Sequence, residues 1–159
     1  MLARRTLLII LIALGLGAWY ATYKYDRNLS GVSKDETEFM VKRAITFIKT
    51  QGESAAYAEI SNRAGRFVDR DLYVVVYTME GKVLAHGANG KMIGKTLIDL
   101  TDIDGKTFIK ERIELAKTKT SFWQTYKFTN PENKRIEPKL TYCERLNQTI
   151  VCGGFYPES

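Results

Sequence analysis

The chain has 159 residues, of which 45% are hydrophobic and 26% are charged, which is the composition of one globular domain with a two-layer core. The formal net charge is +6, but the lysines and arginines are dispersed among acidic residues, which argues against nucleic acid as a partner. One histidine cannot build a multi-histidine metal site, and neither HExxH nor GxSxG occurs in the sequence. We therefore expect no metal site, no cofactor and no enzymatic activity.

The N-terminal segment, residues 1–27, has the pattern of an export signal. Arg4 and Arg5 precede an uncharged apolar run at 7–23, close to the lower limit of about 17 residues for a membrane-spanning helix. A small-x-small triplet within the run would allow cleavage as a signal peptide, whereas the aromatic residues that follow it are typical of a membrane interface. We favour an uncleaved signal anchor in a bacterial inner membrane, with residues 28–159 forming one domain in the periplasm or outside the cell.

Two helices are expected at the start of this domain. Ser33 and Glu36 form a capping box, and the apolar residues that follow recur at helical spacing, which predicts a long amphipathic helix over residues 33–51. Gly52 ends that helix, and the next residues predict a short second helix at 53–60.

A β-hairpin follows and forms the centre of the predicted sheet. Residues 72–77 are almost all apolar or aromatic, which predicts a strand covered on both faces, and residues 82–86 resume the pattern. A three-residue loop at 79–81, with its glycine in the left-handed conformation, would set Val74 opposite His86. A two-residue turn would shift this pairing by one residue and move His86 to the other face of the sheet.

The remainder of the chain predicts one more helix and three more strands. The glycine-rich residues 87–94 are expected to form the rim of a pocket, and the acids of residues 101–105 are expected to cap a helix at 106–117. The expected strands are 122–128, 136–146 and 149–156. Consecutive strands joined by short turns pair antiparallel, so this order predicts an α+β fold with about five strands. The long N-terminal helix would cover one face of the sheet, and the loop–helix segment would cover the other.

This layout is PAS-like, and a set of residues recurs in the order expected for one family within it. The set is Arg66-Phe67, Leu72-Tyr73-Val74, Gly81, Ala85-His86, Gly94-Lys95, Asp104-Gly105-Lys106, Trp123, Tyr126-Lys127, Lys139 and Tyr142. With these residues the chain resembles the single Cache domain of bacterial extracellular sensors. The resemblance covers roughly residues 34–156.

The resemblance implies a sensor that binds a small metabolite, such as a short carboxylate, outside the membrane. Cache domains of this kind pass their state to a cytoplasmic output domain through a transmembrane helix. The sequence shows no kinase, cyclase or methyl-accepting segment, so we expect signalling through a partner, either in a homodimer or beside a receptor or sensor kinase. The alternative is a structural or protein-interaction module of an envelope complex that has kept the fold without a ligand.

Residues of the types needed for a carboxylate site occur on the predicted strands. Such a site needs a fixed cation, neutral hydrogen-bond donors and an apolar wall that excludes water. The candidates are Lys139 as the cation with Arg66 in reserve, His86, Tyr73, Tyr126 and Tyr142 as donors, and Trp123 and Met92 as walls. Each has a purely structural alternative, since strand aromatics are commonly core residues and a lysine after a proline can be an exposed edge charge.

The two cysteines are predicted to form a disulfide. If Asn147 and Gln148 form a two-residue turn, Cys143 lies directly opposite Cys152, with their Cα atoms about 4.5 Å apart. Export supplies the oxidising compartment in which such a pair forms a disulfide. A three-residue loop would break the pairing, and the alternatives would then be two buried thiols or a metal pair.

Overall fold

A computed structural model of the chain describes residues 31–157. The predicted signal anchor at 1–27 lies outside these residues. No helix among the described residues is long and apolar enough to cross a membrane.

The long N-terminal helix, α2 (Lys34–Gln51), begins and ends as the sequence predicts. The Ser33 hydroxyl accepts a hydrogen bond from the Glu36 amide at 3.2 Å, and the Glu36 carboxylate accepts one from the Ser33 amide at 2.9 Å. Gly52 ends the helix with a positive φ of 78°, a conformation that glycine adopts without steric cost. The second helix, α3 (Glu53–Ile60), follows directly.

A six-stranded antiparallel sheet forms the centre of the domain. Its strands are β1 (Val68–Asp69), β2 (Leu72–Thr78), β3 (Val83–His86), β4 (Ser121–Thr129), β5 (Ile136–Leu146) and β6 (Thr149–Phe155). Their order is β2-β6-β5-β4, with β1 and β3 both paired to β2. The five predicted strands are present, and β1 is an additional two-residue strand between α3 and β2.

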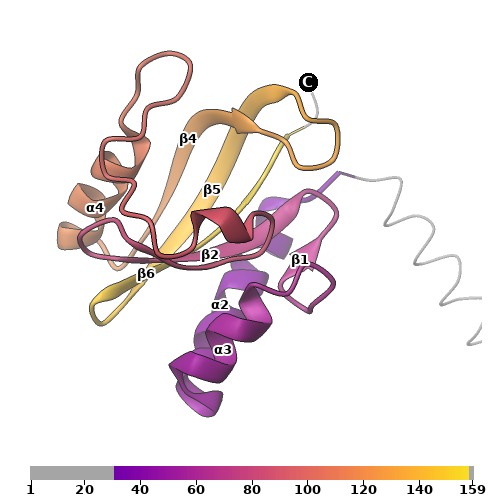
Figure 1. Cartoon of the computed structure of the whole chain (residues 1–159), viewed down its shortest axis with the longest axis vertical. Helices are drawn as coiled ribbons and strands as arrows, with labels where there is room; N and C mark the ends of the chain where they lie inside the picture. Colours follow the sequence, from indigo (N-terminus) through magenta and orange to yellow (C-terminus); the bar gives the residue numbers. More distant parts are fainter. Residues whose placement is uncertain (1–30, 158–159) are drawn as a thin grey trace, which may run out of the picture. The chain divides into compact units, whose positions relative to one another are not determined.

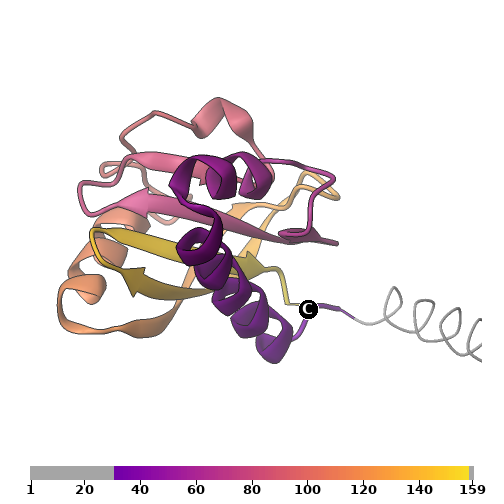
Figure 2. The ribbon, with the colours of Figure 1, turned by 90° about the horizontal axis from the view of Figure 1, so that it is seen from below.

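Each face of the sheet is covered by a different layer (Figures 1 and 2). The helices α2 and α3 pack on one face, whereas α4 (Phe108–Thr118) and the segment after β3 cover the other. The first six residues of β2 are buried on both sides, as the apolar run predicts. We call the two sides the α2 face and the α4 face.

The central hairpin has the predicted loop but a different register. Gly81 has a φ of 83°, and the Thr78 amide donates to the Lys82 carbonyl at 2.9 Å, so the three-residue loop is present. Tyr77 then pairs with Val83, but Val75, not Val74, pairs with His86, because a β-bulge interrupts the register. The predicted pairing of Val74 with His86 is therefore wrong, and the bulge turns the imidazole to the α4 face.

The acids of residues 101–105 do not cap α4, contrary to the prediction. The helix begins at Phe108, two residues later than predicted, with Thr107 as its N-cap residue and no side-chain cap. The Asp102 carboxylate instead accepts hydrogen bonds from the amides of Lys106 at 2.9 Å and Lys127 at 3.0 Å. Asp102 therefore connects the loop before α4 to strand β4 through hydrogen bonds.

The cysteine prediction rests on a register that the structure reproduces. Leu146 pairs with Thr149, and the pairing continues without a bulge to Cys143 opposite Cys152. Asn147 adopts a positive φ of 53°, which allows the tight turn. A disulfide joins the two cysteines, whose Cα atoms are 4.1 Å apart.

Reduction of the Cys143–Cys152 disulfide is expected to lower the free energy of unfolding by about 2 to 3 kcal/mol, because the bond closes a short loop in the unfolded chain. Denaturant unfolding of the oxidised and the reduced protein measures this difference while leaving the sequence unchanged. Equal stability of the two forms would contradict the prediction, as would alkylation of both cysteines without prior reduction.

Candidate ligand-binding site

A small cavity lies on the α4 face, between the sheet and the segment that follows β3. Its lining residues are Tyr73, Val75, Tyr77, His86, Met92, Leu97, Leu100, Phe108, Ile109, Tyr126, Phe128 and Lys139. Its volume of about 20 Å³ is enough for roughly one water molecule. Most of the wall is apolar, and the polar groups on it are one lysine, one histidine and several tyrosine hydroxyls.

Lys139 is the buried cation of this cavity. It lies on β5 and is 2% exposed, and its Nζ is 3.5 Å from the centre of the Tyr73 ring. Within residues 31–157 its Nζ makes no hydrogen bond or ion pair. Burial, and secondly the charge of Arg112, hold the pKa of Lys139 well below its usual value, whereas Asp71 has the opposite effect. The ammonium form is therefore costly until an anion approaches it.

Two adjacent glycines on β6 allow close packing on the two faces of the sheet. A Cβ atom at Gly154 would lie 2.6 Å from Cε of Lys139 and 2.5 Å from Oγ1 of Thr141. A Cβ atom at Gly153 would lie 2.8 Å from a methyl group of Val41 in α2. Gly154 therefore leaves the space in which the Lys139 side chain lies, and Gly153 allows α2 to approach the sheet.

Gly154→Ala and Gly153→Ala are a matched pair of substitutions with different expected effects. Each overpacks the core and is expected to cost about 1 to 3 kcal/mol of stability, as measured by denaturant unfolding. Only Gly154→Ala displaces Lys139, so only it should weaken the binding of an anionic ligand in the cavity. Equal losses of affinity in both variants would contradict the role assigned to Gly154.

His86 is a neutral hydrogen-bond donor. Its Nδ1 accepts hydrogen bonds from the amides of Ala88 at 3.2 Å and Asn89 at 3.0 Å, so the proton of the neutral ring is on Nε2. Burial, and secondly the charge of Lys139, lower the pKa of His86 to about 3. The ring stacks on Tyr73, with their centroids 5.2 Å apart. The imidazole is thus uncharged at neutral pH and held in one orientation.

Arg112 of α4 is a second buried cation, which the sequence reasoning did not identify. It is 1% exposed, and its guanidinium lies 5.0 Å from the ring centre of Tyr77 and 5.3 Å from that of Tyr126. Its Nε donates to the Gln124 side-chain oxygen at 3.2 Å, whereas its Nη2 is buried without a partner among the described residues. Arg112 lies four residues after Phe108, within the apolar stripe of the helix, and this position was the available signal.

The acidic groups near the cavity do not balance these two cations. Asp71 is 8% exposed, and its carboxylate accepts a hydrogen bond from the Tyr156 amide at 2.9 Å. Burial raises the pKa of Asp71, which favours its uncharged form. Lys139 and Arg112 are thus two buried basic groups beside one buried acid, Asp71, and this arrangement suits an anion.

Three of the predicted site residues lie elsewhere. Trp123 and Tyr142 are paired across β4 and β5 on the α2 face, and the Tyr142 hydroxyl donates to Glu144 at 2.7 Å. Arg66 is largely exposed on the α2 side and forms an ion pair with Glu59 at 3.2 Å. The structure brings together Tyr73, His86, Met92, Tyr126 and Lys139. A ligand in this cavity cannot contact the other three.

The fold is that of a PAS-like sensor domain. The model of the single Cache domain 2 family matches residues 30–158, and the chain belongs to this family of ligand-binding sensor domains. The family and fold predicted from the sequence are thereby confirmed. No curated protein matches the chain.

Several solved structures share this fold. A methyl-accepting chemotaxis protein from Vibrio parahaemolyticus is 25% identical, with a TM-score of 0.67 over 77% of this chain and 87% of that chain. A periplasmic sensor domain of a chemotaxis protein is 22% identical, with a TM-score of 0.61 over 76% and 88% of the two chains. A Cache chemosensory domain described for carboxylic acid recognition is 19% identical, with a TM-score of 0.66 over 78% and 92%.

Proposed function

We propose that this chain is an exported sensor domain that binds a short organic acid of two to four carbons in the cavity on the α4 face. The observation that carries the proposal is Lys139, a fully buried cation without an acidic hydrogen-bonding partner among the described residues. A buried charge is retained at such a cost when something compensates it, and a ligand carboxylate would do so.

Lys139, Arg112, His86 and two of the tyrosines have separate roles in this proposal. Lys139 is the countercharge of the carboxylate, and Arg112 behind the aromatic wall adds positive potential. Nε2 of His86 and the hydroxyls of Tyr73 and Tyr126 donate hydrogen bonds to the ligand oxygens. The remaining lining residues, Met92 among them, exclude water. The ligand-binding step requires no bond to be made or broken, so we propose a non-catalytic sensor.

Ligand entry requires the cavity to enlarge. A volume of about 20 Å³ is smaller than any organic acid, so the segment between β3 and α4 must move outward. Backbone hydrogen bonds hold its first half to the hairpin, among them those from the Val83 amide to Lys95 at 2.9 Å, from the Gly94 amide to Val83 at 2.8 Å and from the Leu97 amide to Gly81 at 3.0 Å. Outward movement of the segment breaks such hydrogen bonds, and this conformational change can report ligand binding.

We further propose that the domain is held outside the inner membrane by residues 1–27 and acts through a partner. The disulfide supports an oxidising compartment such as the periplasm. Similarity to a domain of a methyl-accepting chemotaxis protein supports a signalling partner, either a second copy of the chain or a receptor or sensor kinase.

A thermal-shift panel of acetate, propionate, lactate, pyruvate and succinate tests the proposal on the full-length protein. A ligand that binds only the folded state raises the melting temperature with increasing concentration. We expect such a rise for at least one of these acids. No rise with any of them would favour the alternative, a ligand-free interaction module of an envelope complex.

A further inference from the structure

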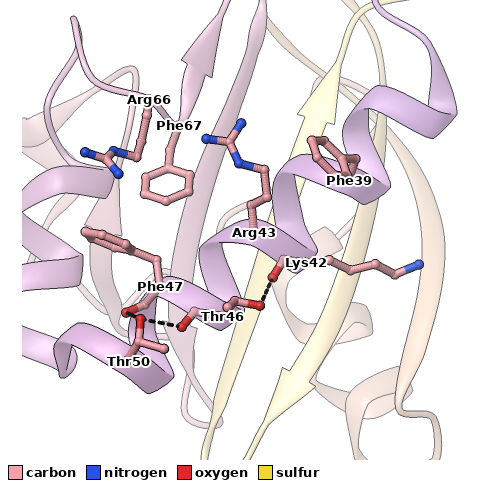
Figure 3. A pocket seen from close by; sticks show the side chains of 8 residues that line it. All are labelled: Phe39, Lys42, Arg43, Thr46, Phe47, Thr50, Arg66 and Phe67. Carbon is pink, nitrogen blue, oxygen red and sulfur yellow. Dashed lines mark hydrogen bonds between the residues drawn. The ribbon is translucent and has the colours of Figure 1, made fainter.

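A second hollow lies on the side of the domain away from the cavity, along the outer surface of α2 (Figure 3). It is lined by Phe39, Lys42, Arg43, Thr46, Phe47, Thr50, Arg66 and Phe67. Its volume is about 370 Å³, and it is open to solvent along its length. We call it the α2 groove.

The α2 groove has an aromatic surface. The rings of Phe47 and Phe67 pack with their centroids 5.5 Å apart, and they form its base (Figure 3). Phe39 lies on α2, as Phe47 does. Its side chain is 63% exposed, which makes it the second most exposed large hydrophobic residue among those described. Exposed apolar surface bounded by polar residues is characteristic of protein interaction sites.

The charged residues of the α2 groove are all basic. The Arg43 guanidinium stacks over Phe39 at 5.7 Å, and that of Arg66 stacks over Phe47 at 5.0 Å. Stacking on a ring fixes the plane of a guanidinium and leaves its N–H edges for a carboxylate. Arg66 and Lys42 already form ion pairs, but Arg43 forms none within residues 31–157. The free cation thus lies beside the most exposed aromatic ring of the groove.

We infer that the α2 groove docks a segment of a partner protein in which an apolar side chain is flanked by aspartate or glutamate. The aromatic base receives the apolar side chain, and the arginine edges receive the carboxylates, a combination typical of energetically important contacts in protein interfaces. The open shape favours a polypeptide, because small molecules bind in sites that enclose most of their surface. The α2 groove is separate from the cavity. The inference rests on the proposed function, because the groove would be the surface that contacts the proposed signalling partner.

Fluorescence anisotropy of labelled short peptides with the full-length protein tests the inference. The peptides carry a central Trp or Leu flanked by Asp and Glu, and matched peptides carry Asn and Gln at the flanking positions. We expect the acidic peptides to bind with affinity that falls as salt is added, and the amide peptides to bind at least about tenfold more weakly.

Arg43→Glu and Lys49→Glu make the same charge change at exposed positions of α2. Arg43 lines the α2 groove, whereas Lys49 lies outside it. Arg43→Glu is expected to weaken acidic-peptide binding at least about tenfold, and Lys49→Glu to leave it within about twofold. Equal effects of the two variants would show general electrostatic attraction and overturn the inference. So would the failure of every acidic peptide to bind. Loss of self-association in Arg43→Glu without peptide binding would identify a second copy of this chain as the occupant instead.

Discussion

Lys139→Met is expected to weaken the binding of a short organic acid at least about 30-fold, which corresponds to about 2 kcal/mol. Methionine has nearly the length of lysine without its charge, so the variant keeps the packing against Tyr73 and removes the countercharge. The remaining donors, His86 and the tyrosines, then face a desolvated carboxylate that no adjacent cation neutralises. Titration calorimetry with the acid that gives the largest thermal shift measures the loss.

The same substitution should leave the ligand-free domain at least as stable as the wild type, because it removes a buried charge that no acid pairs with closely. Loss of affinity without loss of stability distinguishes a binding residue from a structural one. Lys127→Met is the matched control, since Lys127 lies on the neighbouring strand, is partly exposed and forms a surface ion pair with Asp104. It should change the affinity by less than about twofold. Equal affinity of wild type and Lys139→Met would remove Lys139 from the site.

Acid binding is expected to weaken as the pH rises, by up to about tenfold per pH unit. The pKa of Lys139 is well below its usual value in the ligand-free domain, and a carboxylate beside the amine must raise it again. The complex therefore holds more protons than the free protein between these two pKa values, so binding takes up a proton in that range. Calorimetry in buffers with different ionisation enthalpies measures this uptake directly.

The neighbouring groups do not produce the same dependence. His86 has a pKa of about 3 and is already neutral above the acidic range, and burial raises the pKa values of Tyr73 and Tyr156 above the usual value for tyrosine. Asp71, whose pKa is raised by burial, can add a step only at the acidic end. The slope should therefore disappear in Lys139→Met. An affinity that rises with pH, or an unchanged slope in that variant, would contradict the assignment.

The register of the hairpin could not be predicted from the sequence of the hairpin alone. The loop was predictable because Gly81 and its spacing are local features, whereas the bulge depends on distant pairing. The Val83 amide bonds to Lys95, and Lys82 forms a bridge with Thr96, so a later loop holds the outer edge of β3. Nothing within the hairpin specifies this partner. The bulge places His86 opposite Val75, and this pairing puts the imidazole in the cavity.

The inclusion of Tyr142 and Trp123 in the predicted site was an avoidable error. Tyr142 lies three residues after Lys139 on one strand, and an odd spacing places the two side chains on opposite faces. Trp123 and Tyr126 are separated by the same odd spacing on β4. The cysteine pair was predictable because it required only counting outward from a turn. To predict that Arg112 is buried, one would have had to place a charged residue within the apolar stripe of a helix. Charged residues are rarely buried without a compensating environment.

The most direct test of the buried basic site compares each short acid with its own neutral amide by titration calorimetry on the full-length protein. Acetate and acetamide, or lactate and lactamide, have nearly the same shape and differ mainly in charge. A site organised around Lys139 should bind the acid at least about 30-fold more tightly than the amide. Equal binding of the two members of every pair, or binding of neither, would contradict the account.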